Sequence, residues 1–156
     1  MTVELVPTRL DERKLFIDNL QTAFRRADGS NKFRNEDLPR FFKRTNATLW
    51  NILADKVLVG GAVLIINGVT QRNKLSLLFV NADYRNRGVG FAAWRVIEKL
   101  FTATKVWETS TPWLDKRNVH FYLNKCGFHA VSIYNPHHPL QQSDEEIYLA
   151  LEKIMR

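Results

Sequence analysis

One stretch, Leu75–Gly90 (LSLLFVNADYRNRGVG), constrains the fold of this 156-residue chain more than any other. It opens with an apolar run, Leu75–Val80, which predicts a strand covered on both faces and therefore central in a sheet. After a polar turn, apolar residues recur at three- and four-residue steps, which predicts a helix over Gly88–Phe101. The stretch therefore predicts a strand, a loop and a helix in direct succession.

The loop that starts this helix suits a phosphate group. Backbone N–H groups at a helix N-terminus have no internal partner, and the helix dipole adds partial positive charge. Gly88 and Gly90 remove Cβ atoms that would hold an anion away, while Arg85 and Arg87 add full charges. The spacing matches neither a G-x-x-x-x-G-K-[ST] nor a G-x-G-x-x-G loop, which argues against ATP and NAD. We expect a pyrophosphate; an ordinary turn with flexible glycines is the alternative.

The remaining pattern predicts a mixed α/β fold around one sheet, in a single domain spanning residues 1–156. The expected strands are Val3–Val6, Thr48–Ala54, Val57–Ile66, Leu75–Val80, Lys105–Ser110, Phe128–Tyr134 and Ile147–Leu151. The expected helices are Leu10–Arg26, Glu36–Lys43, Gly88–Phe101 and Lys116–Lys125. Pro112 is expected to block extension of the fifth strand, and Gly60-Gly61 to mark a bulge or a close backbone approach.

Composition narrows the class of protein. No apolar run approaches the ~20 residues that span a bilayer, and charges interrupt the N-terminus before a signal-peptide core can form, so we expect a cytoplasmic protein without a membrane partner. The single cysteine, Cys126, is expected to be a small buried hydrophobe. Four histidines lack metal-site spacing, so we expect no metal, although His120 or His138 is a candidate for lining an acceptor pocket. No G-x-S-x-G elbow supports serine hydrolysis.

The net charge of +7 is concentrated in a basic segment, Arg25–Arg44, which also holds several phenylalanines. Such a segment could bind nucleic acid, but no nucleic-acid motif accompanies it. We favour an amphipathic helix pair with phenylalanines inward and charges in water. A third interpretation is that some of these cations meet the phosphates of a nucleotide ligand.

The hexapeptide Arg85, Asn86, Arg87, Gly88, Val89, Gly90 resembles the [R/Q]-x-x-G-x-[G/A] pattern of the GNAT family of N-acetyltransferases. In that family the pattern binds the pyrophosphate of acetyl-coenzyme A (acetyl-CoA), and the order of elements matches along nearly the whole chain. The resemblance implies a mostly antiparallel mixed sheet of about seven strands, splayed between strands four and five, with about four helices on both faces. It also implies that Phe79 and Val80 pair their backbone with the pantetheine arm.

A second stretch, Asn118–Phe128 (NVHFYLNKCGF), is similar to the family's N-x-x-x-x-Y-x-x-x-G-F segment. The resemblance implies that Asn118 contacts coenzyme A and that Tyr122 lies near the departing sulfur. Tyr122 is then the candidate acid for the thiolate, since phenol and thiol pKa values are about 10 and about 8.5. The alternative is an aromatic side chain that only packs beside Phe121 and Phe128.

Two further roles complete the expected machinery. The oxyanion donor is expected to be a main-chain N–H near Phe79. Glu108, on the strand expected to splay away, is the candidate base for the attacking amine, with an ordinary surface ion pair as the alternative.

The sequence therefore predicts an acetyl-CoA-dependent N-acetyltransferase that acts on a primary amine of a small molecule or peptide, by direct attack in a ternary complex. The alternatives are a non-catalytic acyl-CoA-binding or sensing module and, less favoured, a nucleic-acid binder using Arg25–Arg44. The acceptor stays open; a local acidic cleft from Glu108, Asp115 or Asp144 to Glu146 would favour polycations despite the net charge. The oligomeric state is also open, a homodimer included.

Overall fold

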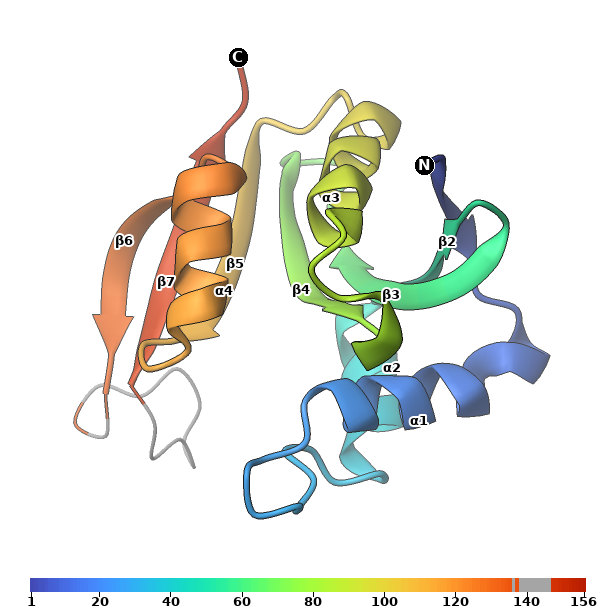
Figure 1. Ribbon diagram of the computed structural model, residues 1–156. Helices are drawn as coiled ribbons and strands as arrows, with labels where there is room; N and C mark the ends of the chain where they lie inside the picture. The colour runs from blue at the N-terminus through green and yellow to red at the C-terminus, as the bar shows by residue number, and fades with distance from the viewer. Residues whose placement is uncertain (136, 138–146) are drawn as a thin grey trace. The chain divides into compact units, whose positions relative to one another are not determined.

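The structure is a computed structural model that describes residues 1–135, 137 and 147–156 (Figure 1). The described residues form the strands β1 (Val3–Pro7), β2 (Thr48–Ala54), β3 (Val57–Ile65), β4 (Arg72–Val80), β5 (Val106–Pro112), β6 (His129–Tyr134) and β7 (Tyr148–Ile154). They also form the helices α1 (Arg13–Ala23), α2 (Asp37–Thr45), α3 (Val89–Leu100) and α4 (Lys116–His120). Short 3₁₀ turns cover Leu10–Glu12 and Ala82–Tyr84, and a π-helical turn, Phe121–Lys125, follows α4.

The strands lie in the order β1-β2-β3-β4-β5-β7-β6. The sheet is mostly antiparallel, and β4–β5 is its parallel pair. That parallel pairing covers three positions, from Arg72↔Val106 to Lys74↔Glu108. The predicted mixed α/β class is confirmed.

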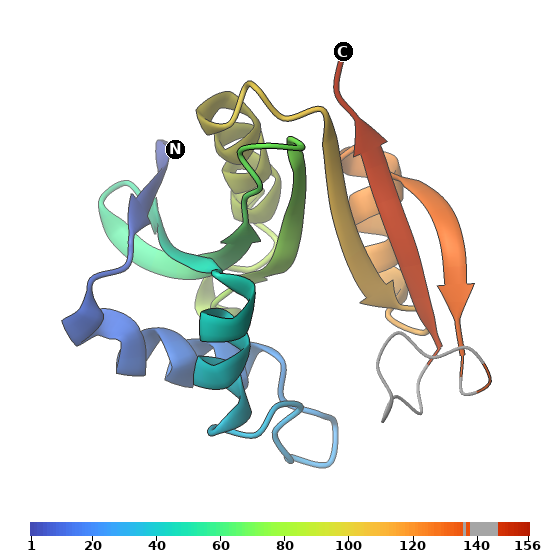
Figure 2. The same cartoon turned by 180° about the vertical axis from the view of Figure 1, so that it is seen from behind.

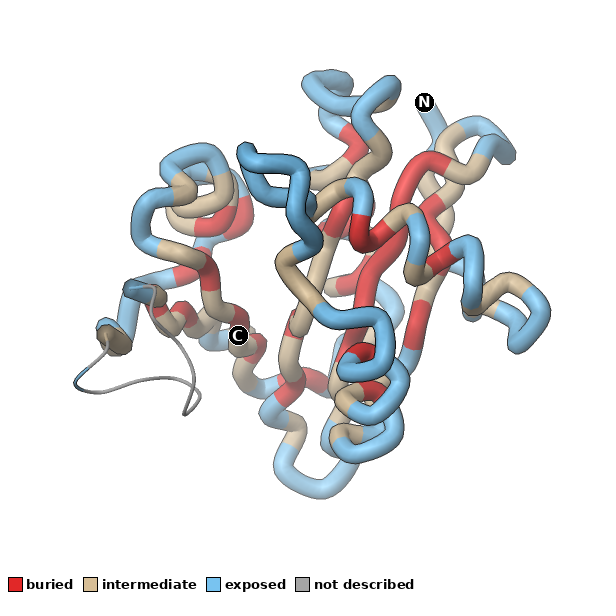
Figure 3. Tube along the Cα trace, turned by 90° about the horizontal axis from the view of Figure 1, so that it is seen from below, coloured by how far each residue is buried: buried red, intermediate tan, exposed pale blue. Residues whose placement is uncertain are grey.

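The chain divides into two compact units, which we describe separately. Unit 1 comprises residues 1–66 and 77–102, and unit 2 comprises residues 67–76 and 103–156. In each unit most buried positions lie on the strands and helix faces, while most of the described loop residues are exposed or half-buried (Figure 3). The single domain over residues 1–156 stays a prediction.

In unit 1, the second half of β4 is covered on both faces, as the sequence predicted. Phe79 and Leu77 pack into a cluster with residues of α1 and α2, including Phe16. Leu78 and Val80 pack with the other cluster, which holds residues of β3 and α3. Since successive strand residues point to opposite faces, this alternation places α1 and α2 on one face of the unit 1 strands and α3 on the other (Figures 1 and 2).

The β3 glycines combine the two features expected of them. The β2–β3 register shifts between Ile52 and Leu53, which leaves Val59 as an extra residue on β3. A Cβ on Gly60 would lie 2.2 Å from the carbonyl oxygen of Phe79, and one on Gly61 would lie 2.5 Å from the Phe16 ring. The β4 backbone therefore approaches β3 more closely than any side chain would allow.

The basic segment Arg25–Arg44 has its phenylalanines inward. Phe42 is buried at 2% exposure, and Phe24, Phe33 and Phe41 pack against the same cluster. The arginines of the segment are exposed. The solvated-face interpretation therefore fits the structure of this segment.

In unit 2, α4 covers one face of the β5, β7 and β6 strands (Figures 1 and 2). The expectation that Pro112 would end the fifth strand at Ser110 was wrong, because Pro112 is the last residue of β5 and pairs with Tyr148. Proline has no backbone N–H to donate, but at a strand end this removes little of the pairing. The next residue, Trp113, donates its N–H to the Ile147 carbonyl at 2.7 Å and continues the ladder.

Two helix predictions also changed. The first helix opens with a 3₁₀ turn and ends at Ala23 rather than Arg26. The last predicted helix, Lys116–Lys125, is one α-helical turn followed by a π-helical turn, in which the Cys126 N–H bonds to the Phe121 carbonyl five residues earlier. Among the described residues, no helix has the length and apolar character needed to cross a membrane.

Candidate active site

The loop Arg85–Gly88 joins β4 to α3 and is exposed along its whole length. Asn86 and Gly88 adopt left-handed backbone conformations, with φ of 63° and 80°. Gly88 is the N-cap of α3, and a Cβ built on it would meet nothing within 4 Å. The first N–H groups of α3, from Val89 and Gly90 onward, therefore start beside open space rather than beside a capping side chain.

Arg85 holds this loop in place. Its Nε donates to the Val80 carbonyl at 3.1 Å, and its Nη2 donates to the Ala23 carbonyl at 3.3 Å. These bonds tie the loop to the end of β4 and to the end of α1. The guanidinium of Arg87 lies 5.6 Å from the centre of the Tyr84 ring, a cation–π arrangement. The sequence predicted both arginines as phosphate ligands, and the structure also gives each one a local partner.

Phe79 and Val80 end β4 immediately before the loop. Phe79 is 5% exposed, and its ring meets that of Phe16 edge-on, with centroids 5.4 Å apart. On the β3 side, the N–H of Asn81 donates to the Val59 carbonyl at 2.7 Å. The β4–β5 register does not extend beyond Lys74, so it leaves the backbone of Phe79 and Val80 outside the parallel pairing.

Tyr122 lies in the π-helical turn of unit 2 and is 6% exposed. Its ring packs edge-on between Phe121 and Phe128, at centroid distances of 5.2 and 5.6 Å. These contacts fit the alternative interpretation from the sequence, in which Tyr122 packs beside Phe121 and Phe128.

The Tyr122 hydroxyl is also engaged. It hydrogen bonds with the hydroxyl of Thr109, which donates its own proton to the Leu75 carbonyl at 2.8 Å. Burial raises the pKa of the Tyr122 phenol, the nearby Cys126 thiol adds to the rise, and the bond with Thr109 opposes it. The phenol therefore stays protonated at neutral pH, which a general acid requires.

The spacing around Tyr122 differs from the segment that it resembles. Four residues separate Tyr122 from Gly127, where the family segment has three, and the asparagine lies correspondingly closer. Leu123 therefore occupies the position that the segment, counted back from Gly127, gives to tyrosine.

Asn118 lies in the single turn of α4. Its backbone N–H donates to the Asp115 carboxylate at 3.2 Å, which makes Asp115 the N-cap of this helix. Asp115 is therefore used in capping, rather than free for the acidic cleft that the sequence suggested. Asp144 to Glu146, the other part of that cleft, and His138 lie outside the described residues.

Glu108 makes an ion pair across three strands. Its Oε1 accepts from Nη2 and Nε of Arg72 at 2.7 and 3.0 Å, and the same Nη2 donates to Oε2 of Glu152 at 2.8 Å. Glu108, followed by Glu152, raises the pKa of the Arg72 guanidinium. Because Thr109 points toward Tyr122, its neighbour Glu108 lies on the opposite face of β5. The structure does not bring the candidate acid and the candidate base together.

With this geometry established, comparison with known proteins identifies the family. Residues 14–128 match the model of the Acetyltransferase (GNAT) family, which is more than two thirds of the chain. The chain belongs to the GNAT family. The match contains α3 with its loop, β4, β5 and the Tyr122 segment, and it confirms the family that the sequence predicted.

A sequence relative of this GNAT chain is the uncharacterized protein YrkN of Bacillus subtilis (strain 168). The two are 45% identical over 104 residues, which is 67% of this chain and 56% of YrkN. The alignment therefore spans little more than half of that relative.

Solved structures share the fold at low identity. An acetyltransferase from B. subtilis in complex with CoA is 18% identical, with a TM-score of 0.69 and coverage of 99% and 98% of the two chains. An Elizabethkingia anophelis GNAT acetyltransferase with acetyl-CoA bound is 15% identical (TM-score 0.71; 98% of each chain). The ribosomal-protein-S18-alanine N-acetyltransferase of Escherichia coli is 10% identical (TM-score 0.72; 98% and 94%). These likenesses show the GNAT fold.

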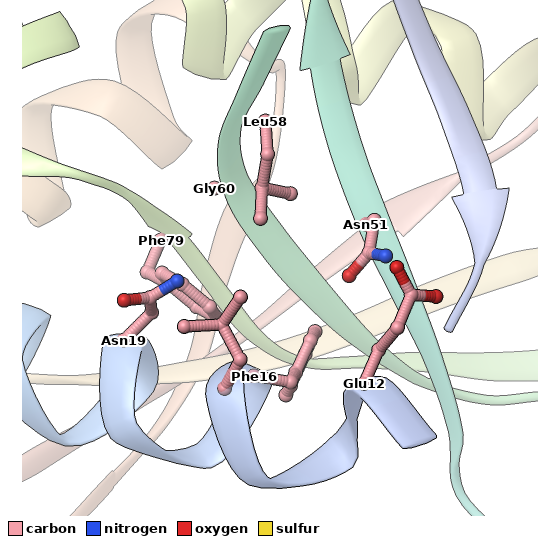
Figure 4. Close-up of a pocket in the computed structure, with 8 residues that line it drawn as sticks. Glu12, Phe16, Asn19, Asn51, Leu58, Gly60 and Phe79 are labelled. Atoms are coloured by element: carbon pink, nitrogen blue, oxygen red, sulfur yellow. The ribbon is translucent and has the colours of Figure 1, made fainter. Parts of the chain in front are cut away.

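Two features of this GNAT chain had no signal in its sequence motifs. The first is Thr109, which hydrogen bonds with Tyr122 and with the Leu75 carbonyl on β4. The only sequence pattern that includes it is the two-residue spacing of Trp107, Thr109 and Thr111, which places all three on the buried face of β5. The second is a pocket in unit 1 between α1 and the strands β2, β3 and β4 (Figure 4). It reaches from Phe79 to Glu12, a residue that only local helix-start patterns would single out. His120, a candidate for lining an acceptor pocket, accepts at Nδ1 a hydrogen bond from Nδ2 of Asn124 at 2.7 Å. The described residues contain no group of three or more potential metal ligands.

Proposed function

We propose that this chain is an acetyl-CoA-dependent N-acetyltransferase that transfers the acetyl group to a primary amine by direct attack in a ternary complex. The observation that carries the proposal is the loop that ends β4, where Gly88 caps α3 in a left-handed conformation beside open space. It occurs in a chain of the acetyltransferase family, and the solved relatives named above include complexes with CoA and acetyl-CoA.

In this proposal unit 1 binds the cofactor. The pyrophosphate accepts hydrogen bonds from the first N–H groups of α3, where the helix dipole favours an anion. Arg85 keeps the loop folded against Val80 and Ala23, and Arg87 adds positive charge at the surface. The pantetheine arm pairs with the backbone of Phe79 and Val80 as an added strand. Asn118, in unit 2, is the proposed side-chain contact to coenzyme A.

The proposed reaction joins the amine nitrogen to the acetyl carbonyl carbon and breaks the carbon–sulfur bond. The products are an N-acetyl amine and coenzyme A, whose thiolate takes a proton. A main-chain N–H near Phe79 stabilises the oxyanion. Tyr122 supplies the thiolate proton, which requires its hydroxyl to exchange the bond with Thr109 for one with sulfur. The raised pKa keeps the phenol protonated at neutral pH, but it also makes Tyr122 a weaker proton donor to the thiolate than a free tyrosine.

The attacking amine must lose a proton before or during attack, because only the neutral amine is nucleophilic. Glu108 is the proposed base, through water. Proton transfer to Glu108 requires its ion pair with Arg72 to loosen.

The first test is thermal unfolding with acetyl-CoA, coenzyme A, ATP, NAD or a short oligonucleotide. Binding at 100 times the dissociation constant should stabilise the folded protein by about 2.7 kcal/mol. We expect only the two coenzyme A species to raise the midpoint, and Gly88→Glu to abolish the effect. Gly29→Glu is the matched control, since Gly29 has φ of 87° and equally open surroundings. A shift with the oligonucleotide alone would overturn the proposal.

A non-catalytic acyl-CoA sensor is the second candidate, and the burial of Tyr122 favours it. A sensor would show the same thermal shift without releasing coenzyme A in the presence of any amine. Detection of free thiol with an amine panel separates the two functions.

A further inference from the structure

Thr109 is the polar side chain that bonds to the proposed acid inside unit 2. It lies on β5 and is 3% exposed. Its hydroxyl donates to the Leu75 carbonyl on β4 at 2.8 Å and hydrogen bonds with the Tyr122 hydroxyl. Leu75 and Tyr122 are buried as well. These three residues therefore form a buried chain of two hydrogen bonds.

The direction of the bond between Thr109 and Tyr122 follows from the number of protons. A threonine hydroxyl carries one proton and two lone pairs. Because the Thr109 proton is directed to the Leu75 carbonyl, Thr109 can only accept from Tyr122. The phenol proton therefore points at Thr109 in the free protein, and it has to turn away from Thr109 to reach a sulfur.

The phenolate that remains after proton transfer needs a hydrogen-bond donor. Burial raises the pKa of Tyr122, Cys126 and Asp115 add to the rise, and the bond with Thr109 opposes it. A hydrogen bond that lowers the pKa of an acid stabilises its ionised form. Bonds to a charged oxygen are also stronger than bonds between neutral groups. Thr109 therefore stabilises a phenolate more than it stabilises the phenol.

We propose that Thr109 is a positioning residue that reverses its hydrogen bond with Tyr122 during turnover. In the resting protein it accepts from the phenol. Once Tyr122 has given its proton away, Thr109 turns its own proton from the Leu75 carbonyl to the phenolate. The inference rests on the proposed acetyltransferase function, with Tyr122 as the acid.

The proton transfer balances without a further reactant. The O–H bond of Tyr122 breaks, and an S–H bond forms on coenzyme A. The negative charge moves from the sulfur to the phenolate oxygen, while Thr109 keeps its proton throughout. The proton that the amine releases on becoming an amide then restores the phenol.

The first test is Thr109→Val, which keeps the shape of the side chain and removes its hydroxyl. Release of coenzyme A from acetyl-CoA is measured with n-butylamine, 1,4-diaminobutane and a dipeptide with a free N-terminus. We expect kcat to fall about tenfold or more, while the acetyl-CoA thermal shift is kept. Thr109→Ser retains the hydroxyl and should recover most of the loss. An unchanged kcat in the valine variant, or a serine variant as slow as the valine variant, would overturn the proposal.

Thr111→Val is the matched control. Thr111 lies on the same face of β5 and is 1% exposed, and its Oγ1 has no hydrogen-bond partner among the described residues. The substitution there removes a hydroxyl from the buried face without removing a hydrogen bond, so kcat should stay unchanged. Equal losses in the two valine variants would assign the effect of Thr109→Val to packing and refute the proposed role.

A double variant gives a test that does not depend on the stability of Thr109→Val, which leaves the Tyr122 hydroxyl unpaired. Tyr122→Phe combined with Thr109→Val removes both hydroxyls. If Thr109 acts through Tyr122, the double variant should have a kcat within about twofold of that of Tyr122→Phe alone. Losses that multiply would show that Thr109 acts independently of Tyr122, contrary to the proposal.

The same measurements separate failure of this inference from failure of the proposed function. Thiol release that Tyr122→Phe reduces and Thr109→Val does not would overturn the role of Thr109 alone. Thiol release that Tyr122→Phe leaves unchanged would remove Tyr122 as the acid, and the role of Thr109 with it. No thiol release by the wild type with any of the three amines would overturn the acetyltransferase and this inference together.

Discussion

The proposed cofactor loop in unit 1 and the proposed catalytic residues in unit 2 differ in how many of their polar groups already bond to the protein. In unit 1, the loop Arg85–Gly88 is exposed, and its glycine places the N–H groups of α3 beside open space. In unit 2, Tyr122 is buried and bonded to Thr109, Asn118 is tied to its N-cap, and Glu108 is paired with Arg72. The first half is open to a ligand without rearrangement, while the second must exchange protein contacts for substrate contacts.

This difference teaches that binding and catalysis can be separated by mutation. Changes in the loop should alter acetyl-CoA affinity with little effect on stability. Changes around Tyr122 should alter turnover, stability or both, since each group there also holds the unit together.

The largest expected effect is that of Tyr122→Phe. If the phenol protonates the thiolate, turnover should fall about 100-fold or more, in line with general-acid contributions, while the acetyl-CoA thermal shift is kept. Tyr84→Phe, which removes the hydroxyl but keeps the ring that Arg87 contacts, should leave turnover unchanged. A loss of less than threefold in the Tyr122 variant would make that residue a packing residue only.

The free energy of unfolding should also depend on alkaline pH, because of Tyr122 in unit 2. The folded-state pKa of Tyr122 is raised above its ordinary value of 10.0, so below that pH the phenol is neutral in both states. Above it, the unfolded chain ionises first, and stability should fall by about 1.4 kcal/mol per pH unit relative to Tyr122→Phe. Urea unfolding of both proteins from neutral pH to strongly alkaline pH measures this; parallel curves would contradict the buried, neutral phenol.

In the unit 1 loop, Arg85→Ala should weaken acetyl-CoA binding about tenfold, because the loop loses two hydrogen bonds to backbone carbonyls. Arg85→Lys distinguishes the reasons. It keeps the charge but not the two-bond geometry. A lysine variant that binds like the alanine variant supports the loop-holding role, and one that binds like the wild type supports charge alone.

The smallest effect is expected for Glu152→Gln, which removes one partner of Arg72 and leaves the proposed base in place, so turnover should change less than threefold. Glu108→Gln removes the proposed base, and turnover should fall about 100-fold. Small and equal effects of the two variants would leave Glu108 as an ion-pair partner of Arg72 only.

The elements that could be predicted from the sequence are those with local causes. Apolar periodicity located β4 and α3, and β2 was predicted at its observed ends. The two residues left between the predicted strands Thr48–Ala54 and Val57–Ile66, Asp55 and Lys56, form a tight turn in which both have positive φ. The loop Arg85–Gly88 could be predicted because the strand before it and the helix after it are its neighbours in the sequence.

Tertiary structure alone decided which groups meet. Arg72 pairs with Glu108 and Glu152, which lie 36 and 80 positions away, and Thr109 reaches Leu75 across 34. These contacts depend on strand order and register, and a shift of one residue would turn each side chain to the other face. The same reasoning explains why Glu12, Asn19 and Asn51 had no signal, since a pocket forms only where a helix packs against strands from elsewhere in the chain. Periodicity and turn chemistry act between neighbours in sequence, whereas the site is made of neighbours in space.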